Sequence, residues 1–177
     1  MGLKKIAAED FNTNIFRDLD RGWMLLTAGD RQEKFNPMTV SWGFMGTFWF
    51  KPMVIVGVRP QRYTFGLMTE YDTFSLCAFP PEYHPALSFC GSHSGRDGDK
   101  TVPAGLTPIA GDRIAAPVFA EAELILECRK TYAAPLDGKS FLNKALINEC
   151  YRDRDFHQLF FGEVLEIRGV DKYCQKG

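Results

Sequence analysis

The fold is decided by the stretch from Gly22 to Arg59, in which three apolar runs follow one another at short intervals. Residues 22–29 read GWMLLTAG, residues 38–45 read MTVSWGFM and residues 53–59 read MVIVGVR. Each run has the length of a strand, is rich in aliphatic or aromatic residues, and is bounded by glycine, proline or a polar connector such as DRQEKFNP. Consecutive runs of this kind predict an antiparallel sheet.

The same pattern continues along the rest of the chain. It predicts further strands at 72–79, 117–132 and 159–170, short helices at 62–70, 80–90 and 141–152, and a long glycine-rich loop at 91–111. A regular alternation of strands and helices is absent, which disfavours a doubly wound parallel sheet. We therefore predict one mainly β (α+β) domain over residues 1–177, a barrel or sandwich with a few appended helices.

Composition narrows the class of function. Hydrophobic residues make up 45% and charged residues 24% of the chain, and the formal net charge is −1. This balance gives no overall attraction to nucleic acid or to an anionic membrane. There is no apolar run of about 18 residues, and the first ten residues lack the apolar segment of a secretory signal. The odd number of five widely spaced cysteines, without a CxxC, predicts reduced thiols in a cytosolic protein.

The strand at 38–45 carries the first candidate site. On a strand, Thr39, Ser41 and Gly43 share one face, and Met38, Val40 and Trp42 share the other. A face of small hydroxyl residues and glycine leaves room for a flat ligand, whose polar edge the backbone can bind. The alternative is a half-buried strand with a polar face toward solvent.

The second candidate lies where an apolar strand ends and a short helix begins. A helix N-terminus offers free N–H groups and a positive dipole end, and here Arg59, Arg62 and the Thr64 hydroxyl are added to it. Together they predict a phosphate site. The alternative is a solvated turn whose threonine caps the helix.

Two further segments are candidates for ligand contacts. The loop CGSHSGRDGDK at 90–100 offers hydroxyls, a histidine and two cations, but it fits neither a nucleophile elbow nor a Walker A motif. It either closes over a polar ligand or is a surface loop. Cys90 with His93 is only half of a metal site, so no metal site is predicted. His157 precedes the last strand and either positions a proton or plays a structural role.

These pieces, in this order, resemble the flavin reductase-like family with the FMN-binding split-barrel fold, and within it the flavoredoxin-type branch. The resemblance rests on motifs of modest length whose order and spacing are specific. The matching segments are Asn36–Gly43, Lys51-Pro52, Val58–Thr64, Cys90–Arg96 through Lys100, Ala104–Pro108, and His157 followed by Gly162-Glu163.

The resemblance implies a six-stranded antiparallel Greek-key split barrel that forms a homodimer, with FMN near the subunit interface. It implies cofactor contacts from the strand and the arginine segment and from the loop that closes over the cofactor, with His157 near the redox face as the catalytic candidate. The implied cofactor-binding residues are Met38, Thr39, Val40, Ser41, Trp42, Arg59, Arg62, Tyr63, Thr64, Ser92, Ser94, Gly95, Arg96 and Lys100.

The function that follows from the resemblance is an oxidoreductase that passes electrons from NAD(P)H through FMN to a flavin, a metal complex or a protein. No GxGxxG motif is present, so NAD(P)H is expected to bind transiently over the flavin rather than in a domain of its own. The alternatives are a non-enzymatic flavoredoxin-type electron carrier and a split barrel that binds another ligand, such as haem. Between Trp42 and Lys51 the family pattern often has a small or polar residue, whereas this chain has Phe50. This difference is expected to affect which electron donor or acceptor approaches the flavin ring.

Overall fold

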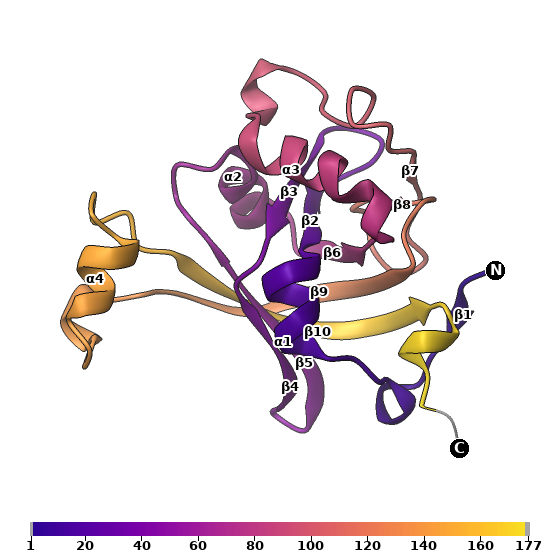
Figure 1. Cartoon of the computed structure of the whole chain (residues 1–177), viewed down its shortest axis with the longest axis horizontal. Helices are drawn as coiled ribbons and strands as arrows, with labels where there is room; N and C mark the ends of the chain where they lie inside the picture. Colours follow the sequence, from indigo (N-terminus) through magenta and orange to yellow (C-terminus); the bar gives the residue numbers. More distant parts are fainter. Residues whose placement is uncertain (1, 176–177) are drawn as a thin grey trace.

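The computed structural model describes residues 2–175, and Figure 1 shows the arrangement of its elements. Its helices are few and short, and most of the remaining regular structure is strand. The helices are α1 (Ile15–Arg17), α2 (Tyr63–Glu70), α3 (His84–Ser92) and α4 (Ala145–Cys150). The strands are β1 (Lys4–Lys5), β2 (Met24–Gly29), β3 (Phe35–Val40), β4 (Gly43–Phe48), β5 (Lys51–Val58), β6 (Thr73–Ala78), β7 (Pro108–Ile109), β8 (Val118–Phe119), β9 (Leu124–Pro135) and β10 (Gln158–Gly169).

The main sheet is antiparallel and curls into a barrel that stays open between its two edge strands. Its strand order is β3-β2-β6-β9-β10-β5-β4, with β1 paired to β10. The strands at the two ends of this order, β3 and β4, are joined only by Ser41 and Trp42. A sheet whose two edges are two residues apart along the chain must curl until the edges come close together. No pairing joins β3 to β4 within residues 2–175, so the predicted split barrel is confirmed, and the split lies between these strands.

The strand count differs slightly from the prediction because the run at 38–45 forms two strands instead of one. β3 pairs with β2 as far as Val40 opposite Met24. The next residue toward the N-terminus of β2, Trp23, has φ 58° and leaves the strand conformation. Without a partner in β2, the chain crosses the split and resumes as β4 beside β5. The predicted run at 117–132 is also interrupted, since β8 ends at Phe119 and β9 begins at Leu124.

Two apolar layers hold the barrel together. The interior is filled by side chains such as Leu26, Val56 and Phe74, all of which are almost completely buried. A second cluster, which includes Leu87 and Phe119, lies between the outer face of the sheet, helix α3 and the segment that carries β8. Helix α3 is therefore fixed against β3, next to the split.

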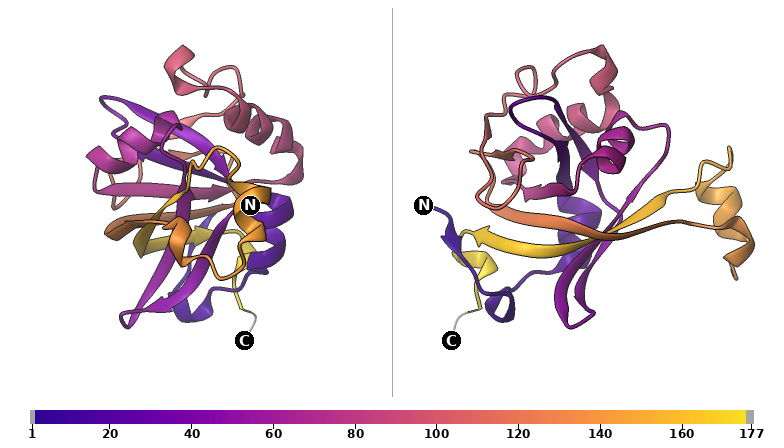
Figure 2. Two further views of the ribbon diagram at one scale, coloured as in Figure 1. Left: turned by 90° about the vertical axis from the view of Figure 1, so that its left-hand side faces the viewer. Right: turned by 180° about the vertical axis from the view of Figure 1, so that it is seen from behind.

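The β9–β10 hairpin extends beyond the barrel as an arm. Both strands have 12 residues, and the segment between them carries α4 away from the rest of the molecule (Figures 1 and 2). The arm returns to the barrel at His157, immediately before β10. In the described part of the chain, no helix has the length and hydropathy needed to cross a bilayer.

Candidate functional site

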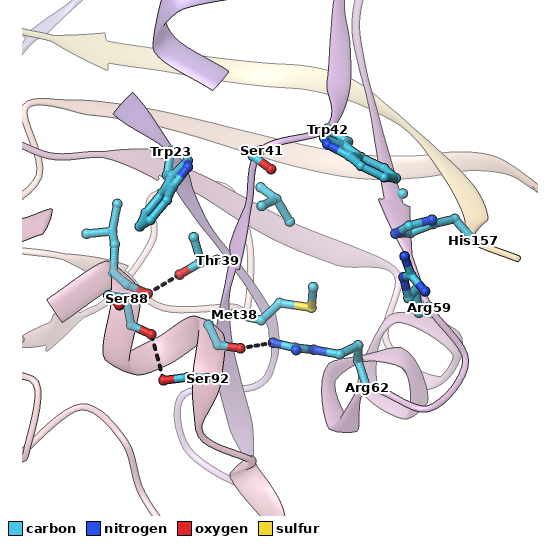
Figure 3. A pocket seen from close by; sticks show the side chains of 14 residues that line it. Trp23, Met38, Thr39, Ser41, Trp42, Arg59, Arg62, Ser88, Ser92 and His157 are labelled. Atoms are coloured by element: carbon cyan, nitrogen blue, oxygen red, sulfur yellow. Dashed lines mark hydrogen bonds between the residues drawn. The ribbon is translucent and has the colours of Figure 1, made fainter. Parts of the chain in front are cut away.

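A pocket of about 450 Å³ lies at the split, where β3 gives way to β4. Its walls come from the end of β3, the Ser41–Trp42 link, the end of β5, helix α3 and the base of the arm (Figure 3). We call this the ring pocket. It is lined by Trp23, Met38, Thr39, Val40, Ser41, Trp42, Gly57, Arg59, Arg62, Leu87, Ser88, Gly91, Ser92 and His157.

Helix α3 and strand β3 meet closely at one wall of the ring pocket. The Thr39 hydroxyl donates a hydrogen bond to the Leu87 carbonyl, and a Cβ at position 91 would lie 3.2 Å from the Thr39 Cβ. Glycine at 91 therefore permits this approach. The prediction that Thr39, Ser41 and Gly43 form one strand face is wrong, because the strand ends at Val40. Thr39 and Ser41 nevertheless both line the ring pocket.

The two arginines at the pocket have different partners. The Arg59 guanidinium lies 2.5 Å from an Asp155 carboxylate oxygen, donates to the Cys150 carbonyl at 2.9 Å, and stacks over the Tyr151 ring. Arg59 therefore ties the arm to the barrel. Arg62 donates to the Gly91 carbonyl at 2.7 Å, and no carboxylate in residues 2–175 forms an ion pair with it.

Arg62 is thus a half-buried cation without a carboxylate partner among the described residues. Burial lowers the pKa of its guanidinium, and repulsion from Arg59 adds to this effect. The charged form is disfavoured by its surroundings, so the arrival of an anion at this arginine would be stabilising.

A smaller pocket of about 240 Å³ adjoins the ring pocket and shares Met38, Arg62 and Ser92 with it. We call this the anion pocket. The structure brings the predicted arginine segment and the predicted loop together here, as the sequence indicated. The predicted residues that line only this pocket are Tyr63, Thr64, Ser94, Gly95, Arg96 and Lys100.

Lys100 and Arg96 supply positive charge to the anion pocket. The buried Lys100 ammonium donates to the carbonyls of Cys90 at 2.9 Å and His93 at 3.3 Å, and burial lowers its pKa to about 8. The Arg96 guanidinium lies over the Tyr63 ring. As for Arg62, the described residues provide no carboxylate that pairs with either cation. The anion pocket therefore holds positive charge that the protein does not neutralise.

Thr64 lines the anion pocket, and its contact with a phosphate stays a prediction. It is buried, and its hydroxyl accepts a hydrogen bond of 2.7 Å from the Asn36 amide. It does not cap α2, whose N-terminus has no side-chain cap. Its contact with Asn36 fixes the start of α2 against β3. The first two residues of α2, Tyr63 and Thr64, therefore line the anion pocket at the positive end of the helix dipole.

His157 lies at the boundary between barrel and arm. Its Nδ1 is 2.9 Å from the Tyr151 hydroxyl, and its ring lies 5.2 Å from the Trp42 ring. A Cβ on residue 57 would lie 3.2 Å from the imidazole Cδ2, so glycine at this position of β5 makes room for the ring. Burial, followed by repulsion from Arg59, lowers the pKa of His157 to about 4.

The lowered pKa disfavours protonation of His157 near neutral pH. The acidic residue two positions before it, Asp155, pairs with Arg59. The imidazole is neutral at pH 7, so it acts as a hydrogen-bonding group with one donor and one acceptor nitrogen.

The two pockets together fit a flat, heteroatom-rich ring with an anionic tail. The ring pocket has the volume of a small-molecule site, which is about 300–1,000 Å³. It offers tryptophan rings at positions 23 and 42, which border it on either side of the β3 end, and hydroxyls from both β3 and α3 (Figure 3). The anion pocket supplies the cations for a phosphate. FMN has these features, so the residues present fit this cofactor.

Sequence reasoning missed five residues that line the ring pocket. Leu87 with Gly91, and Ser88 with Ser92, are pairs four residues apart in α3, but the predicted helix ended at residue 90, so helical spacing did not group them. Trp23 and Gly57 had no such signal. Trp23 was part of an apolar run, and Gly57 is significant only because His157 packs against it.

Comparison with known proteins agrees with this geometry. The description "Flavin reductase like domain" matches residues 16–175 of the chain. The chain belongs to this family. A search of curated protein sequences gives no significant match.

Solved structures similar to this flavin reductase-like protein share its fold at low sequence identity. Flavoredoxin of Desulfovibrio vulgaris is 22% identical with a TM-score of 0.66, over 85% of this chain and 70% of that chain. Nitrilotriacetate monooxygenase component B from Bacillus cereus is 20% identical with a TM-score of 0.69, over 88% and 72%. An NADH:FAD oxidoreductase of Streptomyces globisporus, solved with NAD and FAD fragments, is 20% identical with a TM-score of 0.62, over 82% and 73%.

Proposed function

We propose that this protein binds FMN, with the flavin in the ring pocket and the phosphate in the anion pocket, and that it is an NAD(P)H-dependent oxidoreductase. Electrons would pass to a flavin, a metal complex or a protein. The observation that carries the proposal is the junction of the two pockets at Arg62, a half-buried cation without a carboxylate partner. Membership of the flavin reductase-like family supports the same cofactor.

Bound FMN would supply the redox chemistry, which is hydride acceptance and electron transfer. The protein's own residues would bind and orient it. Arg62, Arg96 and Lys100 would hold the phosphate, while Trp42 and the hydroxyls on β3 and α3 would position the ring. The neutral His157, with Nδ1 at the Tyr151 hydroxyl, would offer a hydrogen bond at the ring edge without adding charge.

The proposal includes transient binding of NAD(P)H and a homodimer. Trp42 is half exposed beside the ring pocket, so a nicotinamide can approach there from solvent. The tip of the β4–β5 hairpin and the arm present an exposed aromatic patch, which we define as Phe48, Trp49, Phe50 and Tyr132. Exposed patches of this kind mark interaction surfaces, and a second copy of the chain is the proposed partner. All five cysteines are free, which supports the cytosolic location that belongs to the same proposal.

Titration of the apo-protein with FMN and with riboflavin tests the phosphate assignment. Wild type should bind FMN more tightly than riboflavin. Arg62→Ala should weaken FMN by roughly 10- to 100-fold, because a charge-assisted hydrogen bond contributes about 1.5–3 kcal/mol, and it should change riboflavin binding much less. Arg129→Ala is a matched control, since Arg129 pairs with Glu163 outside both pockets. Equal affinities of wild type for FMN and riboflavin would contradict the assignment.

Anaerobic mixing of the FMN-loaded protein with NADH or NADPH tests the enzymatic part. Bleaching of the flavin absorbance on the time scale of turnover is the expected result. An FMN-loaded protein that neither nucleotide reduces, but that exchanges electrons with another redox protein, would instead be an electron carrier. That outcome would retain the cofactor assignment and reject the reductase activity.

A further inference from the structure

A third pocket lies against the ring pocket, on the other side of Trp42. It has a volume of about 740 Å³ and is bounded by α1 and the residues after it, the start of β4, and the base of the arm. We call it the apolar groove. Its walls include Ile15, Phe16, Leu19, Phe44, Leu136 and Leu159. The groove is therefore large enough for a small molecule and is predominantly hydrophobic.

The apolar groove and the ring pocket share a wall. Ser41, Trp42, Gly57 and His157 line both spaces. An occupant of the groove is consequently separated from an occupant of the ring pocket by little more than the Trp42 and His157 side chains. Electron transfer between two molecules requires this kind of proximity.

The charge of the groove selects against anions. Among its described lining residues, Asp20 is the one that is charged at neutral pH, and it is exposed at the rim. The cations of the site lie on the far side of the shared wall, in the ring and anion pockets. A phosphorylated or carboxylated ligand would find no positive charge in the groove, so the ligand expected there is neutral.

Tyr151 and His157 give the groove one polar end. The Tyr151 side chain is buried, its hydroxyl lies 2.9 Å from the His157 Nδ1, and the Arg59 guanidinium lies over its ring. Desolvation raises the pKa of Tyr151 and lowers that of His157, so both are neutral at pH 7. The neutral phenol and the neutral imidazole carry two donor hydrogens; one lies in the bond between them, and the other can be donated to a carbonyl oxygen.

We propose that the apolar groove binds a neutral, planar aromatic carbonyl compound of the quinone class, which accepts electrons from the flavin site. The proposal rests on the proposed function and specifies its acceptor. The overall step is NAD(P)H, a proton and a quinone giving NAD(P)⁺ and a hydroquinone. The quinone gains two electrons and two protons, so that both carbonyl oxygens become hydroxyls. Both electrons come from NAD(P)H, and solvent supplies the additional proton.

Binding to the apo-protein tests this inference without any flavin chemistry. Isothermal titration with 1,4-naphthoquinone should show binding, and its anionic 2-sulfonate should bind much more weakly. Phe44→Asp, which places a charge on the exposed side of the groove, should weaken naphthoquinone by about 10-fold or more. Leu142→Asp changes a fully exposed residue outside the groove and should have no effect.

A substitution at Tyr151, measured with two ligands, tests the polar end of the groove. Tyr151→Phe removes one hydroxyl and should weaken naphthoquinone by about 2- to 10-fold, the effect of one neutral hydrogen bond. Naphthalene, which has no carbonyl, should bind wild type and Tyr151→Phe equally. Equal losses for both ligands would mean that the substitution damages the groove in general, and would overturn the role of Tyr151.

Three outcomes would overturn the groove assignment. One is the absence of naphthoquinone binding in a protein that binds FMN, which would leave the proposed function intact. Another is complete competition between naphthoquinone and FMN, which would place the quinone in the ring pocket. The last is a dimer that Phe44→Asp converts to a monomer while wild type binds no quinone, which would make the groove a subunit interface. Quinone binding without FMN binding would instead reject the proposed function.

Discussion

Lys100 is a buried amine whose charge depends on pH in the range where proteins are stable. Its pKa is lowered to about 8 because burial disfavours the ammonium, so the free site loses its proton above pH 8. A bound phosphate favours the ammonium and raises this pKa. Between about pH 7 and 8 the phosphate is a dianion (second pKa about 6), so FMN affinity should be nearly constant there. It should fall above pH 8, by at most about tenfold per pH unit for one linked proton.

Riboflavin titrated over the same pH range distinguishes Lys100 from a general effect. It has no phosphate, so its affinity should stay nearly constant. Lys100→Met should bind FMN weakly at all pH values and lose the decline above pH 8. A decline that persists in this variant would assign the titration to another group.

His157 makes the stability of the folded protein depend on pH, and this stability should fall toward acidic pH. Its pKa is lowered to about 4 in the folded protein, against about 6.5 in an unfolded chain. Between these values the unfolded state binds a proton that the folded state does not, so stability should be full above pH 6.5 and decrease as pH falls toward 4. Melting curves of His157→Gln should show a smaller decrease over this range than wild type. His93→Gln, which removes an exposed histidine, should behave as wild type.

At the scale of single elements, the β4–β5 hairpin has an unusual turn. Trp49 and Phe50 both have positive φ values, 53° and 59°, which are the values of a turn that normally contains asparagine and glycine. A non-glycine residue in this conformation costs about 1–2 kcal/mol. Phe50 is fully exposed, so its ring does not compensate by packing within the chain.

Phe50→Gly should therefore be more stable than Phe50→Ala by about 1 kcal/mol in chemical denaturation. Both variants lack the ring, and only the glycine relieves the backbone. Equal stabilities would show that the turn is not strained. Comparing the stability of wild type with that of Phe50→Ala also gives the contribution of the Phe50 ring, because both keep the strained backbone.

The elements were more predictable than their connections. The apolar runs located β2, β5, β6 and β10 closely, because each is a run of strand length bounded by glycine, proline or polar residues. The division of the run at 38–45 was not predictable, because it depends on where β2 stops offering partners to β3. The arginines at 59 and 62 look equivalent in sequence but differ in role, because the fold brings a carboxylate to only one of them. Asp155 from the arm neutralises the first, and the second remains unpaired.

At the scale of the whole molecule, the aromatic patch predicts the state of assembly. Trp49 packs against Tyr132 and Phe161, yet half of its surface stays exposed. The patch is therefore held in place within the chain and is accessible to a partner. Light scattering should give about twice the 20.0 kDa mass of the chain. A double substitution, Trp49→Ser with Phe50→Ser, should shift the protein toward the monomer. A wild-type monomer with FMN bound would reject the subunit-interface part of the proposal.

The position of β10 also dictates when the pocket can form during synthesis. β10 is the last long strand of the chain, yet it lies between β9 and β5 in the sheet. Before residues 158–169 have left the ribosome, the β4–β5 hairpin has no hydrogen-bonded connection to the β3-β2-β6-β9 group. His157, which closes one side of the ring pocket, arrives only one residue earlier. A nascent chain therefore cannot assemble the ring pocket until β10 has left the ribosome, and cofactor binding must follow that step.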